Sequence, residues 1–550
     1  MSASGGFVEV KAQILYPRFN MKKYLFLIIL IAVFVSFFRL GSVTLFDVDE
    51  AVFAQATKEM VESADWITPT YNGENRYDKP ILFYWLMAAS YKAFGINEFA
   101  ARFPSALSGV LLVLSVFLFV RHFRDDKEAF YASIPLALSI YFFMYSHAAV
   151  TDMALSLFIT LSLFSFYLSL KTDKRYIYGF YSCSALAFLT KGLIGIVFPF
   201  GIALVYLFAA ERLQGLKRIF HFKAALLFLT LALPWYTAEY MANGQEFIRQ
   251  FFIKHHFARY AGVISGHKGP VYYYIPVIIA GLFPWIAFLP AGIATVVKEI
   301  KSLKSDKNLL AVHDNPGFFL LIWFGFIFLF FSFSTTKLPN YILSAIPAAS
   351  ILISAGMYPD KGYSSIGISG RRNGFANVFM AIASILIGIA FIFSRAYLVK
   401  MEVYDVAWTY YSALLMFALA AGSLSAMVTK RKYYGYISAV MAVFLCLMSI
   451  KALPAASRYL QGALYQYSLY ARERLGNDDK IIAYGVNNPS IVFYSGHKII
   501  SVRGKEKLMP YMSNAGTLIA IAKARDIETL KDSGFNILET NGRYALLERK

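Results

Sequence analysis

Apolar residues fill most of the chain in stretches of about 17–25 positions, long enough to cross the hydrocarbon core of a bilayer as helices. They predict a mainly α, polytopic membrane protein with about thirteen transmembrane helices. We place these helices at 24–41, 100–120, 129–146, 149–170, 176–190, 192–210, 222–238, 271–297, 316–334, 339–357, 375–397, 406–428 and 434–453.

The segment 42–99 interrupts this pattern with shorter apolar faces. "DEAVFAQATKEMVE" has helical spacing, with Val52, Ala56 and Met60 on one face, and "KPILFYWLMAASYKAFG" predicts a second helix with Pro80 in its first turn. Both are too short or too polar at their flanks to span a membrane. We expect two helices lying at the membrane surface.

The pattern changes again from about residue 460. Short runs rich in β-branched residues, at 480–484, 498–502, 517–522, 536–540 and 543–548, alternate with helix-like segments. They predict a small soluble α/β domain at 460–550, following a transmembrane domain at 1–455. This tail has no Gly-rich phosphate loop, nucleophile elbow or metal-ligand spacing, so we expect an accessory cover.

Charge indicates which side of the membrane each connection occupies. The chain is 58% hydrophobic, only 16% charged and carries a net charge of +20, and its basic residues gather in alternate connections such as "RHFRDDK", "KTDKR" and "KEIKSLKSDK". The positive-inside rule then places the N-terminus in the cytoplasm and, after an odd number of spans, the C-terminal domain outside. Because this charge is dispersed at span ends without a binding motif, nucleic acid is excluded as a partner.

Negative charge concentrates in the outside loop 42–99, which has nine carboxylates against four basic residues. Other ionisable groups reach the same side from distant segments: Asp152 in "SHAAVTDMALS", Lys191, two histidines in "FIKHHFARY", and Lys337 in "FSTTKLPNY". Each has a plainer interpretation, a helix cap for Asp152 or a membrane anchor for either lysine. Their convergence favours a functional site, because charge at the membrane edge is costly.

Such a site suits transfer from a lipid-linked phosphate donor. Cations would hold the departing phosphate, and a carboxylate would orient or deprotonate an acceptor or stabilise positive charge at a sugar carbon. Nucleotide-dependent transfer is not favoured, since no phosphate-binding loop occurs.

The motifs "DE" at 49–50, "YDKPILFYW", "TDMAL", "TKG", "HHFARY…HKGPVYYYIPVIIAGLFPW" and "KLPNYIL" together resemble the bacterial aminoarabinose–lipid A transferase family, over nearly the whole chain. More broadly they resemble the protein-mannosyltransferase-like enzymes of the C-type glycosyltransferase fold. The resemblance implies an inner-membrane enzyme that moves a sugar from a polyprenyl (undecaprenyl) phosphate to an acceptor, such as lipid A, on the periplasmic face.

The resemblance also implies roles for individual residues. The catalytic candidates are Asp49, its neighbour Glu50, and Asp152. The expected donor-phosphate ligands are Lys79, Arg259 and Tyr341, with Lys191 and Lys337 as further candidates. Asp78 and His256, with His255 as a competitor, stand where a divalent metal such as zinc would bind, although the sequence requires no cofactor.

Two other classes of protein share parts of this pattern. A transporter also has many spans and buried charges, but transporters usually show internal repeats and broken mid-membrane helices. A structural membrane protein would not need a carboxylate-rich loop at the lipid boundary. The sugar stays open, as does the acceptor, which is lipid A or another envelope molecule such as a protein or glycan.

Overall fold

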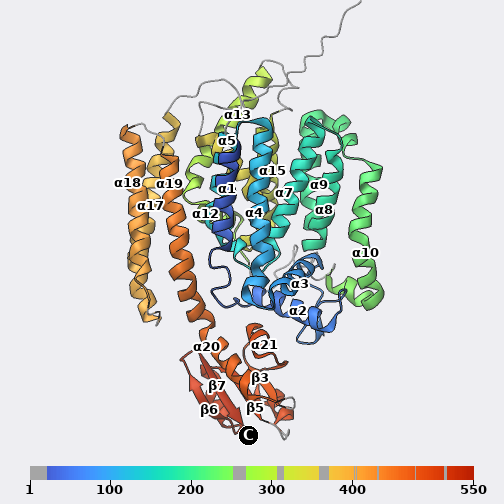
Figure 1. Ribbon diagram of the computed structural model, residues 1–550, viewed down its shortest axis with the longest axis vertical. Coiled ribbons are helices and arrows are strands. Elements are labelled where there is room, and N and C mark those ends of the chain that lie inside the picture. Colours follow the sequence, from blue (N-terminus) through green and yellow to red (C-terminus); the bar gives the residue numbers. More distant parts are fainter. Residues whose placement is uncertain are drawn as a thin grey trace, which may run out of the picture.

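The computed structural model describes residues 21–251, 268–305, 315–357, 371–401, 403, 405–429, 433–476, 479–512 and 517–549. Long helices run alongside one another in a bundle, and a smaller α/β part sits at one end of this bundle (Figure 1). The first half of the chain contains α1 (Met21–Phe37), α2 (Asp49–Ser63), α3 (Leu82–Phe94), α4 (Glu98–Phe123), α5 (Asp126–Ala137), α6 (Ile140–Ser146), α7 (Asp152–Lys171), α8 (Tyr176–Lys191), α9 (Ile194–Gly215), η1 (Leu216–Arg218) and α10 (Phe222–Phe247).

The second half continues the helical part of the molecule. It contains η3 (Val271–Tyr273), α12 (Tyr274–Leu282), η4 (Trp285–Phe288), α13 (Leu289–Ser305), α15 (Pro316–Phe333), η5 (Pro339–Ala345), α16 (Ile346–Met357), α17 (Arg371–Lys400), α18 (Trp408–Thr429), α19 (Tyr434–Leu447), η7 (Met448–Ala452) and α20 (Leu453–Arg474). Every predicted span coincides with one of these helices or with a run of consecutive ones, the longest being η3, α12, η4 and α13 in 271–297.

Fewer helices meet the criteria of length and composition for crossing a membrane than the sequence predicted. Among the described residues, seven helices are long and apolar enough to cross a bilayer, or nine if each of two bent pairs counts as one span. The prediction of thirteen is therefore not confirmed. Helices α1 and α8 have only 17 and 16 residues, α5 and α6 meet at 66°, and the two halves of 271–303 meet at 114°.

Small residues allow close helix packing between α13 and α16. A Cβ atom added at Gly292 would collide with the carbonyl group of Leu352, and one at Gly356 would collide with the backbone N of Gly292 and with the carbonyl group of Phe288, the residue just before α13. The two backbones are therefore in direct contact, as is common where membrane helices pack through small side chains.

The loop between α1 and α4 forms a compact cap on the bundle. Helices α2 and α3 are both present where the sequence predicted them, although α3 begins at Leu82, two residues beyond Pro80. The expected apolar face of α2 is buried at Val52, Ala56 and Met60. Between the helices, β1 (Thr70–Tyr71) and β2 (Glu74–Asn75) form a short antiparallel hairpin.

Five strands form the C-terminal unit, which we define as Lys480–Arg549. They are β3 (Lys480–Tyr484), β4 (Ile499–Val502), β5 (Leu518–Lys523), β6 (Asn536–Thr540) and β7 (Tyr544–Arg549), in the sheet order β4-β3-β5-β7-β6. Strands β4, β3 and β5 are parallel, and β7 and β6 are antiparallel to their neighbours. The short helices are α21 (Ser490–Ser495), α22 (Lys505–Leu508), η8 (Met509–Tyr511), η9 (Ala524–Asp526) and α23 (Ile527–Lys531). All five predicted strands are present.

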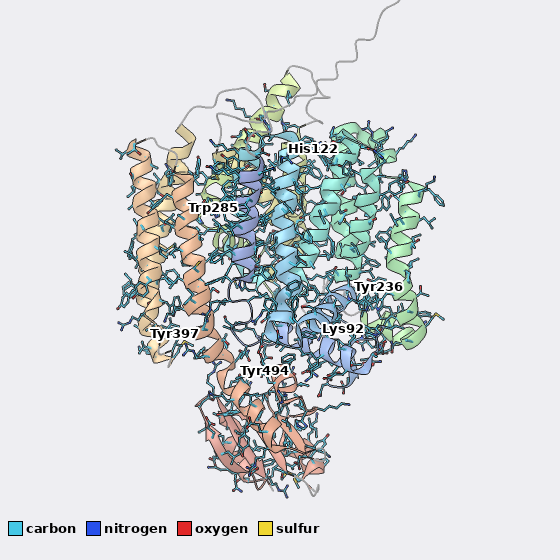
Figure 2. All side chains as sticks on the ribbon, viewed as in Figure 1. Lys92, His122, Tyr236, Trp285, Tyr397 and Tyr494 are labelled. Carbon is cyan, nitrogen blue, oxygen red and sulfur yellow. The ribbon has the colours of Figure 1, made fainter. Side chains whose placement is uncertain are left out.

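The acidic loop and the C-terminal unit lie at the same end of the helices. Lys92 of α3 and Tyr494 of α21 are both at this end, whereas His122, in the basic connection "RHFRDDK", is at the opposite end (Figure 2). This arrangement agrees with the charge pattern, which separates acidic from basic connections.

Candidate functional site

A cavity of about 590 Å³ opens where α2, α7, α8, α9 and α15 meet the loops at the C-terminal-unit end of the bundle. One group of lining residues is polar: Asp49, Arg76, Asp78, Lys79, Thr151, Asp152, Lys191, Ser334, Thr336, Asn340, Tyr341 and Ser344. A second group is apolar: Phe53, Val150, Leu155, Leu193, Ile194, Val197, Phe198, Phe330, Phe331 and Leu338. The cavity is therefore amphiphilic, with charged groups beside a wall of aliphatic and aromatic side chains.

Asp49 is the first residue of α2 and is exposed. Its backbone position follows from the sequence, because α2 begins with two acidic residues at the positive end of the helix dipole. Since its side chain lines the cavity, Asp49 places a carboxylate at the polar part of the lining.

The loop before α3 contributes two cations and a carboxylate. Arg76 donates from Nη2 to Asp78 Oδ2 at 2.7 Å and from Nε to the hydroxyl of Tyr84 at 2.9 Å. Its guanidinium also lies 5.2 Å from the centre of the Phe53 ring. Lys79 Nζ donates to the carbonyl of Asp78 at 3.0 Å. These contacts orient both cations along the cavity wall.

Arg76 was not among the sequence candidates. It stands in the turn-rich run "TPTYNGENRYDKP" and belongs to no motif that we recognised. Its position two residues before Asp78 is the only local sign in the sequence that Arg76 belongs to the site. A guanidinium can donate two hydrogen bonds to one anion, so an arginine is suited to binding phosphate.

Asp152 and Lys191 form an ion pair that also lines the cavity. Lys191 Nζ, on the last residue of α8, lies 2.6 Å from Asp152 Oδ1, and Asn340 donates to the same oxygen at 3.0 Å. Lys191 is also 5.6 Å from the centre of the Tyr341 ring. Asp152 is the first residue of α7, but Thr151 holds the N-cap position. The helix-cap interpretation of Asp152 and the membrane-anchor interpretation of Lys191 therefore give way to this pair.

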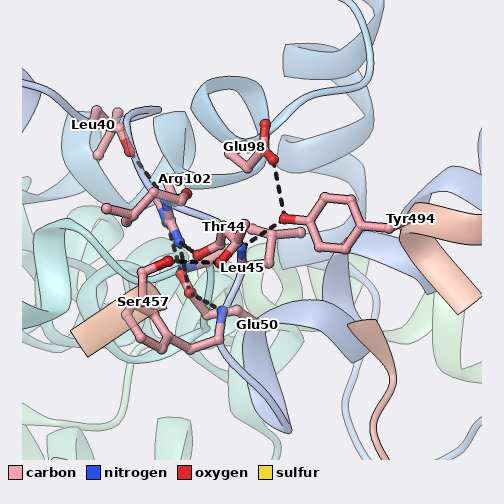
Figure 3. A network of polar contacts seen from close by, with 11 residues as sticks. Leu40, Thr44, Leu45, Glu50, Glu98, Arg102, Ser457 and Tyr494 are labelled. Atoms are coloured by element: carbon pink, nitrogen blue, oxygen red, sulfur yellow. Dashed lines mark hydrogen bonds and ion pairs between the residues drawn. The ribbon is translucent and has the colours of Figure 1, made fainter. Parts of the chain in front are cut away.

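Glu50 is absent from the cavity lining although it follows Asp49 directly. It is 5% exposed and accepts hydrogen bonds from Nε and Nη2 of Arg102 at 3.0 and 2.9 Å and from the N–H of Ala149 at 2.6 Å. Arg102 also donates to carbonyl groups of the preceding loop, including that of Thr44 at 2.9 Å (Figure 3). The geometry thus corrects our expectation for Glu50: it is a buried partner of Arg102 and holds the loop onto α4.

Lys337 is likewise outside the lining. It is 4% exposed, and its Nζ donates to three carbonyl groups at the end of α15, those of Phe331, Ser332 and Ser334, at 2.8–3.0 Å. A lysine that satisfies the last carbonyl groups of a helix acts as a C-terminal cap. The geometry corrects our expectation that Lys337 contacts a donor phosphate.

Several expected residues cannot be located. Arg259, His255 and His256 lie outside the described residues, so the expected pairing of Asp78 with His256 is not tested. Within the described residues, no group of three or more His, Cys, Asp or Glu side chains is arranged to hold a metal ion. One oxygen of Asp78 is bound to Arg76.

A buried carboxyl group anchors the cation-bearing loop to α10. Glu239 is 1% exposed and accepts hydrogen bonds from Thr68 Oγ1 at 3.0 Å and Asn243 Nδ2 at 3.1 Å. Asn243 Oδ1 in turn accepts from Asn75 at 2.9 Å and from the hydroxyl of Tyr77 at 3.0 Å. Burial, with a smaller contribution from nearby Asp65, raises the pKa of Glu239 to about 7, although its hydrogen bonds from Thr68 and Asn243 act to lower it. This network positions the segment that carries Arg76 and Lys79.

Known proteins are similar to this chain in sequence and in fold. The family model described as dolichyl-phosphate-mannose-protein mannosyltransferase matches residues 78–237. The undecaprenyl phosphate-alpha-4-amino-4-deoxy-L-arabinose arabinosyl transferase 2 of Proteus mirabilis is 30% identical over 367 residues, which cover 66% of this chain and 64% of that protein. A protein from Aquifex aeolicus is 34% identical over 343 residues, covering 62% of this chain and 75% of its own length. The chain thus aligns with less than two thirds of the length of the arabinosyl transferase.

The structural match extends over nearly the whole chain. The crystal structure of ArnT from Cupriavidus metallidurans bound to undecaprenyl phosphate superimposes with a TM-score of 0.75 over 96% of this chain and 98% of that one, at 21% sequence identity. At that identity the match establishes the fold, which is the C-type glycosyltransferase fold expected from the sequence. The chain is thus similar in sequence to the undecaprenyl phosphate-aminoarabinose arabinosyl transferases, matches the mannosyltransferase family model over residues 78–237, and has the C-type glycosyltransferase fold.

Proposed function

We propose that this protein transfers a sugar from a polyprenyl phosphate to an acceptor in the bacterial envelope. The observation that carries the proposal is the amphiphilic cavity, which combines the Asp49 carboxylate with Arg76, Lys79 and Lys191 beside an apolar wall. A polyprenyl phosphate sugar likewise has a polar part and an apolar part: an anionic headgroup and a hydrocarbon tail. Guanidinium and ammonium groups bind phosphate through charge-assisted hydrogen bonds.

The transfer step can be written with this chain's own residues. The bond between the sugar's anomeric carbon and the phosphate oxygen breaks, and its electron pair stays on the phosphate, where the three cations stabilise the added charge. An acceptor oxygen forms the new bond to the anomeric carbon. If the acceptor is a hydroxyl, its proton passes to Asp49; if it is an ionised phosphate, no base is needed and Asp49 stabilises positive charge at the anomeric carbon.

The names of the relatives support 4-amino-4-deoxy-L-arabinose as the sugar and undecaprenyl phosphate as its carrier. Lipid A is the acceptor that we propose first, and a protein or glycan hydroxyl is the alternative. We place the reaction on the periplasmic face of the inner membrane, with a cytoplasmic N-terminus, about thirteen spans in residues 1–455, and residues 460–550 as a periplasmic domain. The basic connections support this orientation.

The test is a reconstituted assay with purified full-length protein in lipid nanodiscs. Undecaprenyl phosphate-linked aminoarabinose and lipid A are supplied, and product is followed by mass spectrometry. We expect lipid A to gain the mass of the sugar and free undecaprenyl phosphate to appear in equal amount. Release of undecaprenyl phosphate without sugar on lipid A would redirect the search to hydroxyl acceptors. No consumption of any polyprenyl-linked sugar, with movement of the lipid between leaflets instead, would favour transport and contradict the proposal.

A further inference from the structure

The segment that carries Asp49 is attached to the C-terminal unit through Asp47. Ser490, the first residue of α21, donates to Asp47 twice: from N–H to Oδ1 at 2.8 Å and from Oγ to Oδ2 at 2.6 Å. Asn488 Nδ2 donates to Asp47 Oδ2 at 3.0 Å. The amide of Gln461, in the orientation that satisfies both of its polar atoms, donates to Oδ2 at 2.8 Å and accepts from the Asp47 N–H at 2.9 Å.

Three further connections join the same surfaces. Tyr494 accepts from the N–H of Leu45 at 2.8 Å and donates to Glu98 at 3.0 Å. The side chain of Asn72 forms two hydrogen bonds with the backbone of Ile499, both at 2.9 Å. Ile499 is the first residue of β4, an edge strand of the sheet. These contacts bind the loop before α2 and the β1–β2 hairpin to the C-terminal unit over sequence separations of more than 390 residues.

The chain around Asp49 is therefore fixed on both sides. On the preceding side Asp47 is bound to α20 and to the start of α21, and on the following side Glu50 is bound to Arg102 and to the N–H of Ala149. Asp49, between these two anchors, has an exposed side chain that lines the cavity. A carboxylate with little side-chain support of its own depends on its backbone for its position.

We infer that the C-terminal unit positions Asp49 for the transfer step, and that Asp47 is the residue through which it acts. This inference rests on the proposed function. Asp47 is a positioning residue that does not touch the substrate, and the C-terminal unit is part of the active architecture instead of only a cover. Reaction rates depend steeply on such placement, since an error of about 1 Å costs on the order of 100-fold in rate.

The chemistry of the contact suggests a pair of substitutions that tests it. In Asp47→Asn an NH₂ group replaces Oδ2 and faces the NH₂ group of Asn488, so two donors oppose each other. In Asn488→Asp two carboxylates oppose each other. The double variant Asp47→Asn/Asn488→Asp restores the pair in the reverse direction: the amide at position 47 donates and the carboxylate at position 488 accepts. Restoration of function only in the double variant is the mark of a direct pairing.

The experiment measures kcat and KM for the lipid-linked donor, with the thermal midpoint as a check of folding. We expect Asp47→Asn and Asn488→Asp each to lower kcat by 10–100-fold with KM changed less than threefold, and the double variant to recover at least tenfold over Asn488→Asp. Ser490→Ala, which removes one donor and leaves the charge pattern intact, should lower kcat by about 3–10-fold. Glu506→Gln, on the exposed surface of the same unit, is the matched control and should keep the kcat of the unsubstituted protein.

Each outcome has one meaning. Asp47→Asn and Ser490→Ala with unchanged kcat, or a raised KM with kcat unchanged, would overturn the inference while leaving the proposed function standing. Absence of transfer in the unsubstituted protein would be a failure of the proposed function itself. If Asp47→Asn lowers the thermal midpoint, Ser490→Ala and the double variant decide the question, because Ser490→Ala keeps both carboxylate oxygens of Asp47 and the double variant restores a donor–acceptor pair between positions 47 and 488.

Discussion

Asp49 and Glu50 are neighbours in the chain with opposite environments. Asp49 is exposed at the cavity, whereas Glu50 is buried and accepts three hydrogen bonds from Arg102 and Ala149. The carboxylate that stabilises the fold thus directly follows the carboxylate that faces the cavity. The two substitutions to the neutral amide should have different consequences.

Asp49→Asn should reduce transfer by at least 100-fold with little change in thermal midpoint, because only the charge at the cavity is lost. Glu50→Gln should instead lower the free energy of unfolding by about 3–5 kcal/mol, the cost of leaving a buried partner such as Arg102 uncompensated. Transfer assays and thermal unfolding in detergent measure the two effects. Near-normal transfer by a folded Asp49→Asn protein would move the catalytic role to Asp152.

The cations at the cavity should contribute separately to donor binding. Lys79→Ala and Arg76→Ala should each weaken the affinity for undecaprenyl phosphate by about 1.5–3 kcal/mol, the usual value of a charge-assisted hydrogen bond. Isothermal titration with the purified protein in nanodiscs measures this affinity, and Arg259→Ala is included because the sequence predicts it as a ligand. Lys337→Met is the contrasting variant: it should lower the thermal midpoint, since three carbonyl groups at the end of α15 lose their hydrogen bonds from the Lys337 ammonium group, and leave the affinity unchanged. The assignment fails if Lys337→Met weakens binding while the other three do not.

At the scale of elements, the loop carrying Arg76 depends on its connection to α10. Glu239 is the buried centre of that connection, and its pKa of about 7 lies well above its ordinary value of 4.5. The folded protein therefore holds a proton that the unfolded chain releases between these pH values. By linkage, this group's contribution to stability is fully present below pH 4.5 and is lost as the pH rises through 7.

Glu239→Gln should flatten the pH dependence of the thermal midpoint between about pH 5 and 8. The neutral amide has no charge to desolvate, so the variant should gain relative stability at pH 8, where the unsubstituted protein must bury an ionised carboxylate. Glu246→Gln, on the exposed side of the same helix, serves as the control and should keep the original pH profile. A profile of Glu239→Gln that parallels that of the unsubstituted protein would show that this carboxyl group does not titrate in the window.

For the whole molecule, the open question is whether a metal joins Asp78 to the segment containing His256. One Asp78 oxygen already accepts from Arg76 at 2.7 Å, and two protein ligands make an incomplete zinc shell. We therefore expect a metal-free preparation, verified by elemental analysis, to retain full transfer activity and an unchanged thermal midpoint. Loss of activity on treatment with EDTA, restored by zinc in the unsubstituted protein and not in His256→Ala, would establish the metal instead.

Local sequence patterns were sufficient to predict most helices and strands of this protein. Runs of apolar residues predicted the positions of the long helices, and alternation in the tail predicted five strands, because burial in lipid or in a sheet is decided by the residues of each segment. Asp49 was singled out by the "DE" motif at 49–50 and the family resemblance that this motif carries. Length alone did not predict the bends between α5 and α6 or in 271–303, since these depend on neighbouring helices.

Long-range contacts were decided only by the tertiary structure. The sequence could not show that Glu50 pairs with Arg102, that Asp152 pairs with Lys191, or that Arg76 lines the cavity, because the energy of a charge depends on neighbours that the fold brings together. The same holds for Asp47 and Ser490, which are 443 residues apart in the chain and share two hydrogen bonds. The sequence by itself therefore determined the positions of the long helices, the strands of the C-terminal unit and several of the ionisable groups that line the cavity, Asp49, Lys79, Asp152 and Lys191 among them. Which of the predicted ionisable groups face the cavity and which stabilise the fold was settled by packing, since only packing determines burial and pairing.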